Sequence, residues 1–444
     1  MSIEDVTPVV LDSGSSSIKV SLKENFERMA FLSQNMRAGF ACENKPRVVI
    51  SSVTGQLKKQ SGDGSNVVEM SSPIQRGIVI DWDGATELWE HAFNNLRITP
   101  KCHPMVLTES PFATNADREK MTEIFFEKFN TPGVCFANQA IMSLIGSGRT
   151  TGIVIESGEN TTHITPIFKG RVITGAVNHL DIGGHQLTEY LTTMVSAERS
   201  HIFPNGVTLE MARQIKENLG YVAQDYELEV ATFAAVDSIK RSYDFGDGRV
   251  VSFGKEIFRF SEAMFKPSLL GKTSDGVAEL VWKSIIKTEP DMEKALLGNI
   301  CLTGGNTMIT GFKERMEHEL TALIPPFNQI SVIAKDDRKF AAFNGGSVLA
   351  SLTNRWSHWT TRQEYGESGA SVVHDRSLLP AEKCVDSVSY SYAVFTCSSN
   401  RLQTLLSFAF RTHVQAIWSM GTAEPTIPKR AYWTQEWNLD VRGM

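Results

Sequence analysis

The stretch that decides the fold is residues 152–168, GIVIESGENTTHITPIF, in which an apolar run enters an acidic, glycine-containing turn and a second apolar run follows. This pattern predicts a strand, a turn and a second strand. A similar stretch occurs near the N-terminus, where VVL at residues 9–11 precedes DSGSSSIKV at residues 12–20. Asp12 and Lys19 have the same spacing as Glu156 and His163. Because internal repeats reveal architecture, we expect a duplicated α/β domain.

Strands and helices alternate along both halves of the chain, which is typical of an α/β sheet fold. In the first half we expect a hairpin at residues 8–20, a helix at 83–96 and strands at 104–109 and 134–137. In the second half we expect a strand at 299–303 and a helix at 312–323. Residues 55–72 are rich in Gly, Ser and charge, and this composition predicts an exposed loop.

Length and composition limit the classes of protein to consider. The chain has 444 residues, 41% hydrophobic and 21% charged, with a net charge of −6. The length favours at least two domains, and the charge gives no electrostatic footprint for nucleic acid. No apolar run is long enough to span a membrane, and the N-terminus is too acidic and polar for a signal peptide. Six scattered cysteines predict a reducing compartment, without disulfides or a zinc site.

The glycine turns carry the expected chemistry. Backbone N–H groups in tight turns of small residues bind phosphate oxygens well. Residues 14–16 and 158–160 form two such turns in equivalent places, and residues 304–307 form a third after a strand. Lys19 would supply a cation, and the carboxylates of Asp12 and Glu156 would face a hydrated Mg²⁺. Neither a Walker motif nor a strand-linked dinucleotide motif is present.

The chain resembles the actin family in strings that run in the family's order from about residue 8 to 376. They include LDSGSSSIK, DREKMTEIFFEKFNTP, SGRTTGIVIESGENTTH, IKENLGYVAQDYE, LTGGNTMITGF and RKFAAFNGGSVLASL. The resemblance implies an actin-like ATPase fold, in which two duplicated RNase H-like domains flank a cleft for ATP or ADP with Mg²⁺. Residues 1–146 and 341–376 would form the outer domain, and residues 147–340 the inner domain.

Matched residue by residue, the resemblance implies roles for side chains around this cleft. Gln139 and His163 would orient the attacking water, with Glu156 beside them, since phosphoryl transfer depends mostly on positioning and charge neutralisation. Asp12 and Glu156 would hold Mg²⁺ through water. The residues expected around the nucleotide are Asp12, Gly14, Ser15, Ser16, Lys19, Gly158, Glu159, Asn160, Gly184, Lys216, Glu217, Gly304, Gly305, Thr307, Met308 and Lys339.

The phosphate turns depart from the family at several positions. The family has aspartate at the positions of Glu156 and Glu159, and glycine at those of Ser16 and Asn160. A glutamate displaces or crowds a metal-bound water, and asparagine tolerates positive φ less easily than glycine. We therefore expect a weak ATPase that binds nucleotide and converts ATP to ADP and phosphate slowly.

Three segments also depart from the family. Residues 20–37 form an insertion or come from a wrongly joined gene model. The small outer subdomain is shortened, at about residues 52–72, so filament formation is expected to be impaired. Residues 377–444 match nothing in the family and are a disordered tail, a partner-binding extension or translated non-coding sequence.

Two functions remain open from the sequence. The first is an ATP-binding cytoskeletal protein in the cytoplasm. Actin-like subunits or actin-binding proteins would bind it at a cleft near Ile145, Thr150, Leu349 and Leu352. The second is a non-polymerising subunit of a chromatin-remodelling or other complex, with the nucleus as its location and ATP as a structural ligand. Neither nucleic acid nor membrane is an expected partner, and a degenerate product that folds poorly is a further alternative.

Overall fold

The computed structural model describes most of the chain between residues 7 and 374. The described residues are 7–14, 21–22, 35–41, 43–51, 54–59, 66–75, 77–235, 240–246, 248–326, 328–352 and 359–374. The chain divides into two units, residues 1–391 and 392–444, and every described residue belongs to the first unit. The expected tail at 377–444 therefore lies outside the described residues, and the domain boundaries within the first unit stay a prediction.

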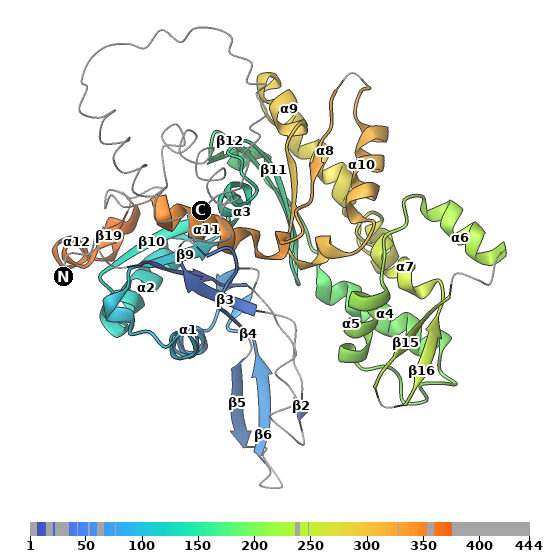
Figure 1. The fold of residues 1–444 in the computed structure, drawn as a ribbon, viewed down its shortest axis with the longest axis horizontal. Helices are drawn as coiled ribbons and strands as arrows, with labels where there is room; N and C mark the ends of the chain where they lie inside the picture. Colours follow the sequence, from blue (N-terminus) through green and yellow to red (C-terminus); the bar gives the residue numbers. More distant parts are fainter. Residues whose placement is uncertain are drawn as a thin grey trace, which may run out of the picture. The chain divides into compact units, whose positions relative to one another are not determined.

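Two sheets of six strands form the framework (Figure 1). The first sheet has the order β19-β10-β9-β1-β3-β4, and the second has the order β13-β12-β11-β17-β18 with β14 beside β12. The strands of the first are β1 (Val9–Asp12), β3 (Asn35–Phe40), β4 (Val48–Ser51), β9 (Met105–Glu109), β10 (Gly133–Asn138) and β19 (Thr360–Thr361). Those of the second are β11 (Gly152–Ser157), β12 (Thr162–Phe168), β13 (Arg171–Val172), β14 (Asn178–Leu180), β17 (Ile300–Thr303) and β18 (Val332–Ile333).

The two sheets follow the same plan, which agrees with the duplication expected from the sequence. In the first sheet β1, β9 and β10 are parallel, and β3 runs antiparallel to β1. In the second sheet β11, β17 and β18 are parallel, and β12 runs antiparallel to β11. The hairpin expected at residues 152–168 is therefore confirmed, with Glu156 opposite His163.

The N-terminal hairpin is not the expected one. Strand β1 pairs with β3, so the hairpin predicted at residues 8–20 is wrong, and residues 13–34 connect its two strands. Within this connection β2 (Ser21–Leu22) pairs with β6 (Asn66–Ser71) instead. Residues 35–37, predicted to end an insertion, belong to β3. The spacing in the sequence indicated a partner for β1 that is close in the chain. The actual partner, β3, comes after a long connection.

Residues 55–72 contain two strands, so the prediction of an exposed loop over this whole segment is wrong. Strands β5 (Thr54–Lys59) and β6 pair antiparallel, and with β2 they form a small third sheet. Four of the seven Gly and Ser residues that suggested a loop fall at residues 61–65, which lie between these strands in the sequence. Two further pairs complete the strands: β7 (Ile74–Gln75) with β8 (Ile78–Val79), and β15 (Arg241–Asp244) with β16 (Val250–Phe253).

Helices surround the strands. They are α1 (Trp82–Leu96), α2 (Asn115–Glu123), α3 (Gln139–Gly146), α4 (Gly184–Glu198), α5 (Leu209–Leu219), α6 (Tyr226–Ala235), α7 (Glu256–Glu262), α8 (Val277–Ile286), α9 (Pro290–Leu297), α10 (Phe312–Leu323), α11 (Ala341–Leu352) and α12 (Arg362–Ser368). A π-helical turn, Ile124–Lys128, extends α2. None of the helices in the described part of the chain is long and apolar enough to cross a membrane.

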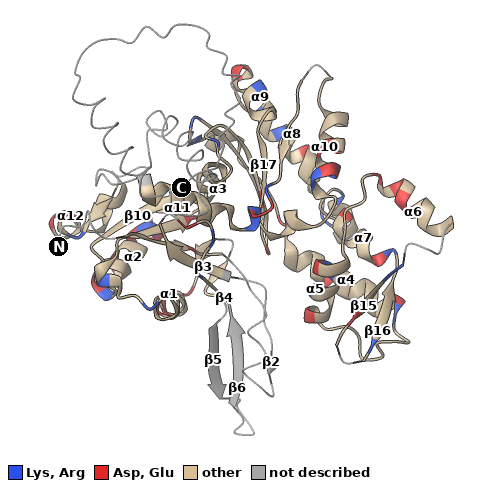
Figure 2. Ribbon diagram, viewed as in Figure 1, with Lys and Arg blue, Asp and Glu red and all other residues tan. Residues whose placement is uncertain are grey.

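Local signals explain where several helices begin. At α2 the Thr114 side chain accepts the N–H of Asp117, and the Asp117 carboxylate accepts the N–H of Thr114. This reciprocal cap satisfies two backbone donors. At α6 the Asp225 carboxylate accepts the N–H of Leu228, and acidic residues occupy the first turn, coloured red in Figure 2. Negative charge there is stabilised by the helix dipole.

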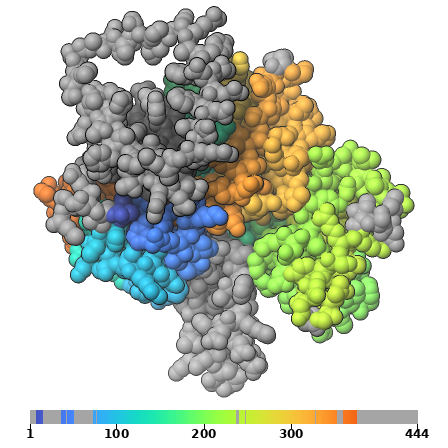
Figure 3. All heavy atoms as spheres, viewed as in Figure 1, coloured from blue at the N-terminus to red at the C-terminus, as the bar shows by residue number. Residues whose placement is uncertain are grey.

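Each sheet has its own apolar core. In the first, Trp89 and Phe93 of α1 pack against Phe125 and Phe129 in a cluster of edge-on and tilted rings. Helix α11 packs against α3 and β1, so segments from both ends of the described chain lie together, blue beside orange in Figure 3. Helices α3 and α11 pack so closely that a side chain at the position of Gly345 would clash with the carbonyl of Met142. Because α3 and α11 both begin at one wall of the site, their contact fixes the position of that wall.

Candidate functional site

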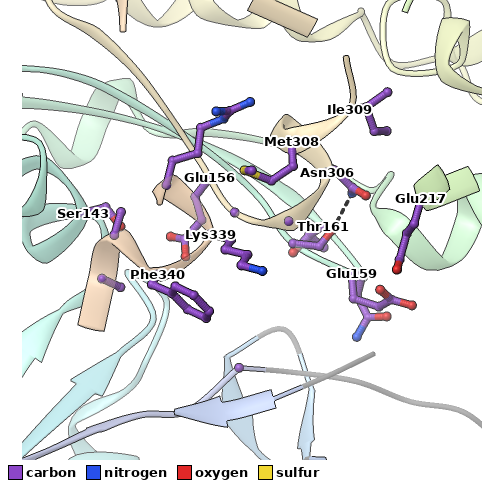
Figure 4. Close-up of a pocket in the computed structure, with 18 of the residues that line it drawn as sticks. Ser143, Glu156, Glu159, Thr161, Glu217, Asn306, Met308, Ile309, Lys339 and Phe340 are labelled. Atoms are coloured by element: carbon purple, nitrogen blue, oxygen red, sulfur yellow. Dashed lines mark hydrogen bonds between the residues drawn. The ribbon is translucent and has the colours of Figure 1, made fainter. Parts of the chain in front are cut away.

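A cavity of about 680 Å³ lies where the strand ends of both sheets and the glycine turns converge. That volume is in the range of pockets that bind small molecules and cofactors. In Figure 4 Glu156 and Phe340 lie at one end of the cavity, and Glu159 and Glu217 lie toward the other.

Most of the residues expected at the nucleotide line this cavity. They are Gly14, Gln139, Glu156, Gly158, Glu159, Asn160, His163, Lys216, Glu217, Gly304, Gly305, Met308 and Lys339. Three others, Asp12, Gly184 and Thr307, lie behind the lining, where they contact the residues that form it. Ser15, Ser16 and Lys19 lie outside the described residues.

The turn between β11 and β12 is held from several sides. The N–H of Gly158 donates to the carbonyl of Thr161 at 3.1 Å. Asn306, which the sequence analysis did not single out, donates its side-chain N–H to the carbonyl of Gly158 at 2.6 Å. The N–H of Gly184 donates to the same carbonyl at 2.9 Å. The described backbone has positive φ at three non-glycine residues, and Asn160 is not among them. The expected difficulty of positive φ at Asn160 therefore does not arise.

The third turn, after β17, requires its first glycine. Gly304 has a φ of 87°, and a side chain there would meet the carbonyl of Ser157 at 2.3 Å. Gly305, by contrast, has no atom within 4 Å of the position a Cβ would take. Its face of the cavity is therefore open to close approach by a ligand. Thr307 is buried and donates its hydroxyl to the carbonyl of Gly304 at 2.8 Å, so it supports the turn from behind.

The buried carboxylate of Asp12 has three partners. Arg37 donates to Oδ2 at 2.6 Å, while Thr108 and Gln139 donate to Oδ1 at 2.9 and 3.1 Å. Asp12 and Arg37 are paired across β1 and β3, as Glu156 and His163 are across β11 and β12. The basic residue equivalent to His163 is therefore Arg37, whereas the sequence repeat had indicated Lys19.

Arg37 and Thr108 are the main site residues that sequence reasoning missed. A signal for Arg37 was present, since it directly precedes the apolar residues 38–40 that the resemblance matched to the family's strand. Thr108 also accepts the N–H of Ser13 at 3.3 Å and so ties the first turn to β9. A lone threonine in an apolar strand gives no such signal.

Glu156 differs from Asp12 in its surroundings. Although part of its side chain reaches the cavity, Oε2 is enclosed and has no hydrogen-bond partner among the described residues. Burial and, after it, the nearby negative charge of Asp12 raise the pKa of Glu156 to about 7, against an opposing effect of Arg37. An enclosed carboxylate oxygen without a donor is suited to a cation or to water bound to a cation. The residues present therefore fit a magnesium ion held through water. Glu156 is the acid that has an oxygen available to such a water.

The other end of the cavity carries a buried cation. Lys216 donates to the carbonyl of Gly184 at 2.8 Å. Burial lowers its pKa, although the charges of Glu159 and Glu217 oppose this effect. Arg213, also at the cavity wall, pairs with Glu217 at 3.1 Å. These polar groups could bind the hydroxyls and ring nitrogens of a nucleoside.

Gln139 and His163, the residues expected to orient water, lie at the phosphate-turn end. Gln139 donates its side-chain N–H to Asp12, to Thr108 and to the carbonyl of Ser13, so its amide is fixed. The Nε2 of His163 lies 3.2 Å from the hydroxyl of Thr161. The structure thus brings together both candidate residues and both acids.

Comparison with known protein families decides the identity of this arrangement. The actin family matches residues 32–378. The chain belongs to the actin family. Its two sheets are the duplicated halves of an actin-like ATPase fold, and proteins of this family generally bind a nucleotide with a divalent metal. The match begins just before β3, so β1 lies outside the matched residues.

Actin-family proteins typically bind actin-like subunits or actin-binding proteins, but the surface expected for this chain is largely closed. Ile145 and Leu349 are buried at 4% and 2% exposure. Thr150 is half-buried, and Leu352 ends α11 with a side chain outside the described residues. The partner surface near these residues stays a prediction.

Proposed function

We propose that the chain binds ATP and ADP in the cavity and acts as an actin-like cytoskeletal protein. The observation that carries this proposal is the convergence of Gly14 and the two glycine turns at residues 158–160 and 304–307 on one cavity, with the buried Lys216 at its other end. Backbone N–H groups of the turns would bind the phosphates, and the polar groups around Lys216 would bind the nucleoside.

Asp12 and Glu156 would hold the magnesium ion through water. When bound, the ion neutralises charge on the phosphate oxygens. Asp12 is already oriented by Arg37, Thr108 and Gln139. Mg²⁺ typically keeps several waters and takes few protein ligands, so this role needs only the two acids.

Hydrolysis in this site is expected to be slow. Gln139 and His163 would orient the attacking water, but Glu156 extends one methylene further than the aspartate of the family. That difference alters the place of any water held at Oε2. Displacements of about 1 Å can reduce a rate by about 100-fold.

Nucleotide binding is tested by titrating the full-length protein with a fluorescent ATP analogue, with Mg²⁺ present. We expect saturable binding that unlabelled ATP and ADP displace. In Gly305→Leu a side chain would enter the open face of the cavity, so affinity should fall at least tenfold. Gly366→Ala is the control, because that glycine also has open space but lies on α12. Absence of binding by the wild-type protein would refute the proposal.

Slow hydrolysis is tested separately by single-turnover phosphate release. Glu156→Asp restores the family's acid and is expected to raise the rate by about tenfold or more. The ATP affinity of this variant should stay within about threefold of wild type. A wild-type rate equal to that of conventional actin, or no increase in Glu156→Asp, would contradict the slow-hydrolysis proposal.

A second candidate is a non-polymerising subunit of a multiprotein assembly in the nucleus. The short outer segment favours it, since residues 54–71 supply only the β5–β6 pair of the small sheet. The first candidate places the protein in the cytoplasm on filaments. Microscopy of a tagged chain together with isolation of its complexes distinguishes them: filaments support the first, and a discrete nuclear complex supports the second.

A further inference from the structure

An exposed phenylalanine links the connection that follows β9 to two histidines of the second sheet. Phe112 is 43% exposed. Its ring centroid lies 5.2 Å from that of His163 and 6.0 Å from that of His179, with interplanar angles of 68° and 76°. The two histidines are directly opposite each other on β12 and β14. One ring thus makes edge-to-face contacts with a pair of imidazoles.

The segment that carries Phe112 is anchored at its base. The N–H of Phe112 donates to the hydroxyl of Ser110 at 3.3 Å, and the N–H of Ala113 donates to the carbonyl of Ser110 at 3.1 Å. The preceding residue of β9, Glu109, forms a two-bonded ion pair with Arg118 of α2, at 2.7 and 2.6 Å. Such a paired geometry fixes orientation as well as charge. The backbone that carries the ring of Phe112 is therefore held in place.

The ring of Phe112 contacts His163 from the side. The imidazole of His163 lines the cavity, and the hydroxyl of Thr161 lies near one ring nitrogen. The second torsion of a histidine side chain has broad minima, so the packing of a neighbouring ring narrows the orientations of the imidazole. The ring of Phe112 packs against the imidazole and restricts its rotation.

We propose that Phe112 is a positioning residue, which holds the His163 imidazole in the orientation needed to direct water at the terminal phosphate. This inference rests on the proposed function. Phe112 belongs to the segment after β9 of the first sheet, and both histidines belong to the second sheet. The correct orientation of His163 therefore depends on the approach of the two sheets.

The contact is tested first without nucleotide, by recording the imidazole proton and nitrogen NMR signals of His163, assigned with His163→Gln. We expect Phe112→Ala to move these signals, because the ring that shields the imidazole is lost. Phe112→Tyr should leave them close to wild type. His179→Ala provides a second test, since it removes the other imidazole that packs on Phe112. Unchanged signals in Phe112→Ala, with an unchanged melting temperature, would overturn the inference.

The effect on the reaction is tested by single-turnover hydrolysis and ATP binding on the same proteins. We expect Phe112→Ala to lower the rate of the chemical step by about tenfold, with the Kd for ATP within about twofold of wild type. Phe112→Tyr should restore the rate, and Leu228→Ala, at an exposed position on α6, should not change it. Equal losses in Phe112→Ala and Phe112→Tyr, or a loss confined to affinity, would overturn the role.

These tests separate the inference from the proposed function. Failure of the wild-type protein to bind ATP refutes the proposed function, whereas the NMR signals still decide whether Phe112 orients His163. If the wild-type protein binds ATP but Phe112→Ala leaves the phosphate-release rate unchanged, the inference alone is refuted.

Discussion

Asp12 and Glu156 occupy equivalent ends of duplicated strands, yet their surroundings give the two carboxyl groups different properties. Asp12 accepts hydrogen bonds from three side chains. Glu156 has an enclosed oxygen without a donor. Burial and the neighbouring negative charge favour the neutral form of Glu156. Without ligand, a proton on Glu156 can take the place of a cation.

The pH dependence of stability should report this difference. The pKa of Glu156 is raised from 4.5 to about 7 in the folded state, first by burial and then by Asp12. Between those pH values the folded protein binds more protons than the unfolded chain, so stability falls as pH rises and levels off above about pH 7. The loss should be on the order of 3 kcal/mol.

Glu156→Gln removes the titrating group, so its melting temperature should change less between pH 4.5 and 7.5 than that of the wild-type protein. Thermal denaturation of the nucleotide-free protein measures this change. Glu87→Gln, at an exposed position on α1, is the control and should keep the wild-type profile. A Glu156→Gln profile parallel to wild type would show that Glu156 titrates normally.

Arg37 is expected to stabilise the fold through Asp12. Its side chain is 22% exposed, while that of Asp12 is fully buried. In Arg37→Ala the buried carboxylate loses its cation, and we expect a loss of about 2 kcal/mol in the free energy of unfolding. Adding Asp12→Asn removes the uncompensated charge and should recover part of this loss.

Urea denaturation measures these free energies. Arg47→Ala is the matched control, because Arg47 also pairs with a carboxylate but is 61% exposed. An exposed pair of this kind contributes at most about 1 kcal/mol. Equal losses in Arg37→Ala and Arg47→Ala would contradict a special role for the Asp12–Arg37 pair.

At the scale of elements, the contact between α3 and α11 controls the wall of the cavity. Gln139 begins α3, and Lys339 and Phe340 directly precede α11. The helices touch through glycines: a side chain on Gly146 would lie 2.4 Å from the carbonyl of Ala341, and one on Gly345 would lie 1.8 Å from the carbonyl of Met142. The main chains themselves therefore set the separation of the helices.

Gly345→Ala should force the helices apart and reduce the free energy of unfolding by about 3 kcal/mol. It should also weaken ATP binding, since both helices carry or adjoin cavity residues. Gly366→Ala, in α12 with open space around it, should be neutral or stabilise by up to about 1 kcal/mol. Chemical denaturation and ATP titration of both variants provide the comparison. A stable Gly345→Ala with normal affinity would show that this contact is adaptable.

The elements also show how far the sequence can predict the structure. Helix α10 was predicted at its observed bounds, and α1 within one residue, because apolar side chains recur at helical spacing. The hairpin at residues 152–168 was found because its strands are adjacent in the chain. The partner of β1 was missed because residues 13–34 intervene, and local spacing carries no information about distant pairing.

The site divides in the same way. Glycine and acid patterns indicated the turns at residues 158–160 and 304–305, and the resemblance to the actin family indicated Lys216. The roles of Asn306, within the predicted third turn, and of Thr108 were missed. Each role depends on the hydrogen bonds of a single side chain, which leave no recurring pattern in the sequence. Pairing across strands, which determines that Arg37 rather than Lys19 stands opposite Asp12, depends on tertiary structure.

At the scale of the whole molecule, the question is whether an intact actin-like framework is enough for assembly. Both large sheets and the cavity are present in the first unit. The small sheet, in contrast, contains β2, a pair of residues, and the six-residue strands β5 and β6. The actin resemblance assigns longitudinal filament contacts to this outer region. The predicted shortening of this region would weaken each subunit addition, and those losses would accumulate along a filament.

We therefore expect the purified protein to stay in the supernatant under conditions in which conventional actin forms sedimenting filaments, with salt, Mg²⁺ and ATP present. Sedimentation and electron microscopy over a range of protein concentrations measure this directly. Conventional actin is the positive control. Glu156→Asp is included because faster hydrolysis should not restore assembly if the small sheet is the limiting surface. Filaments of the wild-type protein at the concentration that suffices for conventional actin would show that the shortened region still makes adequate contacts.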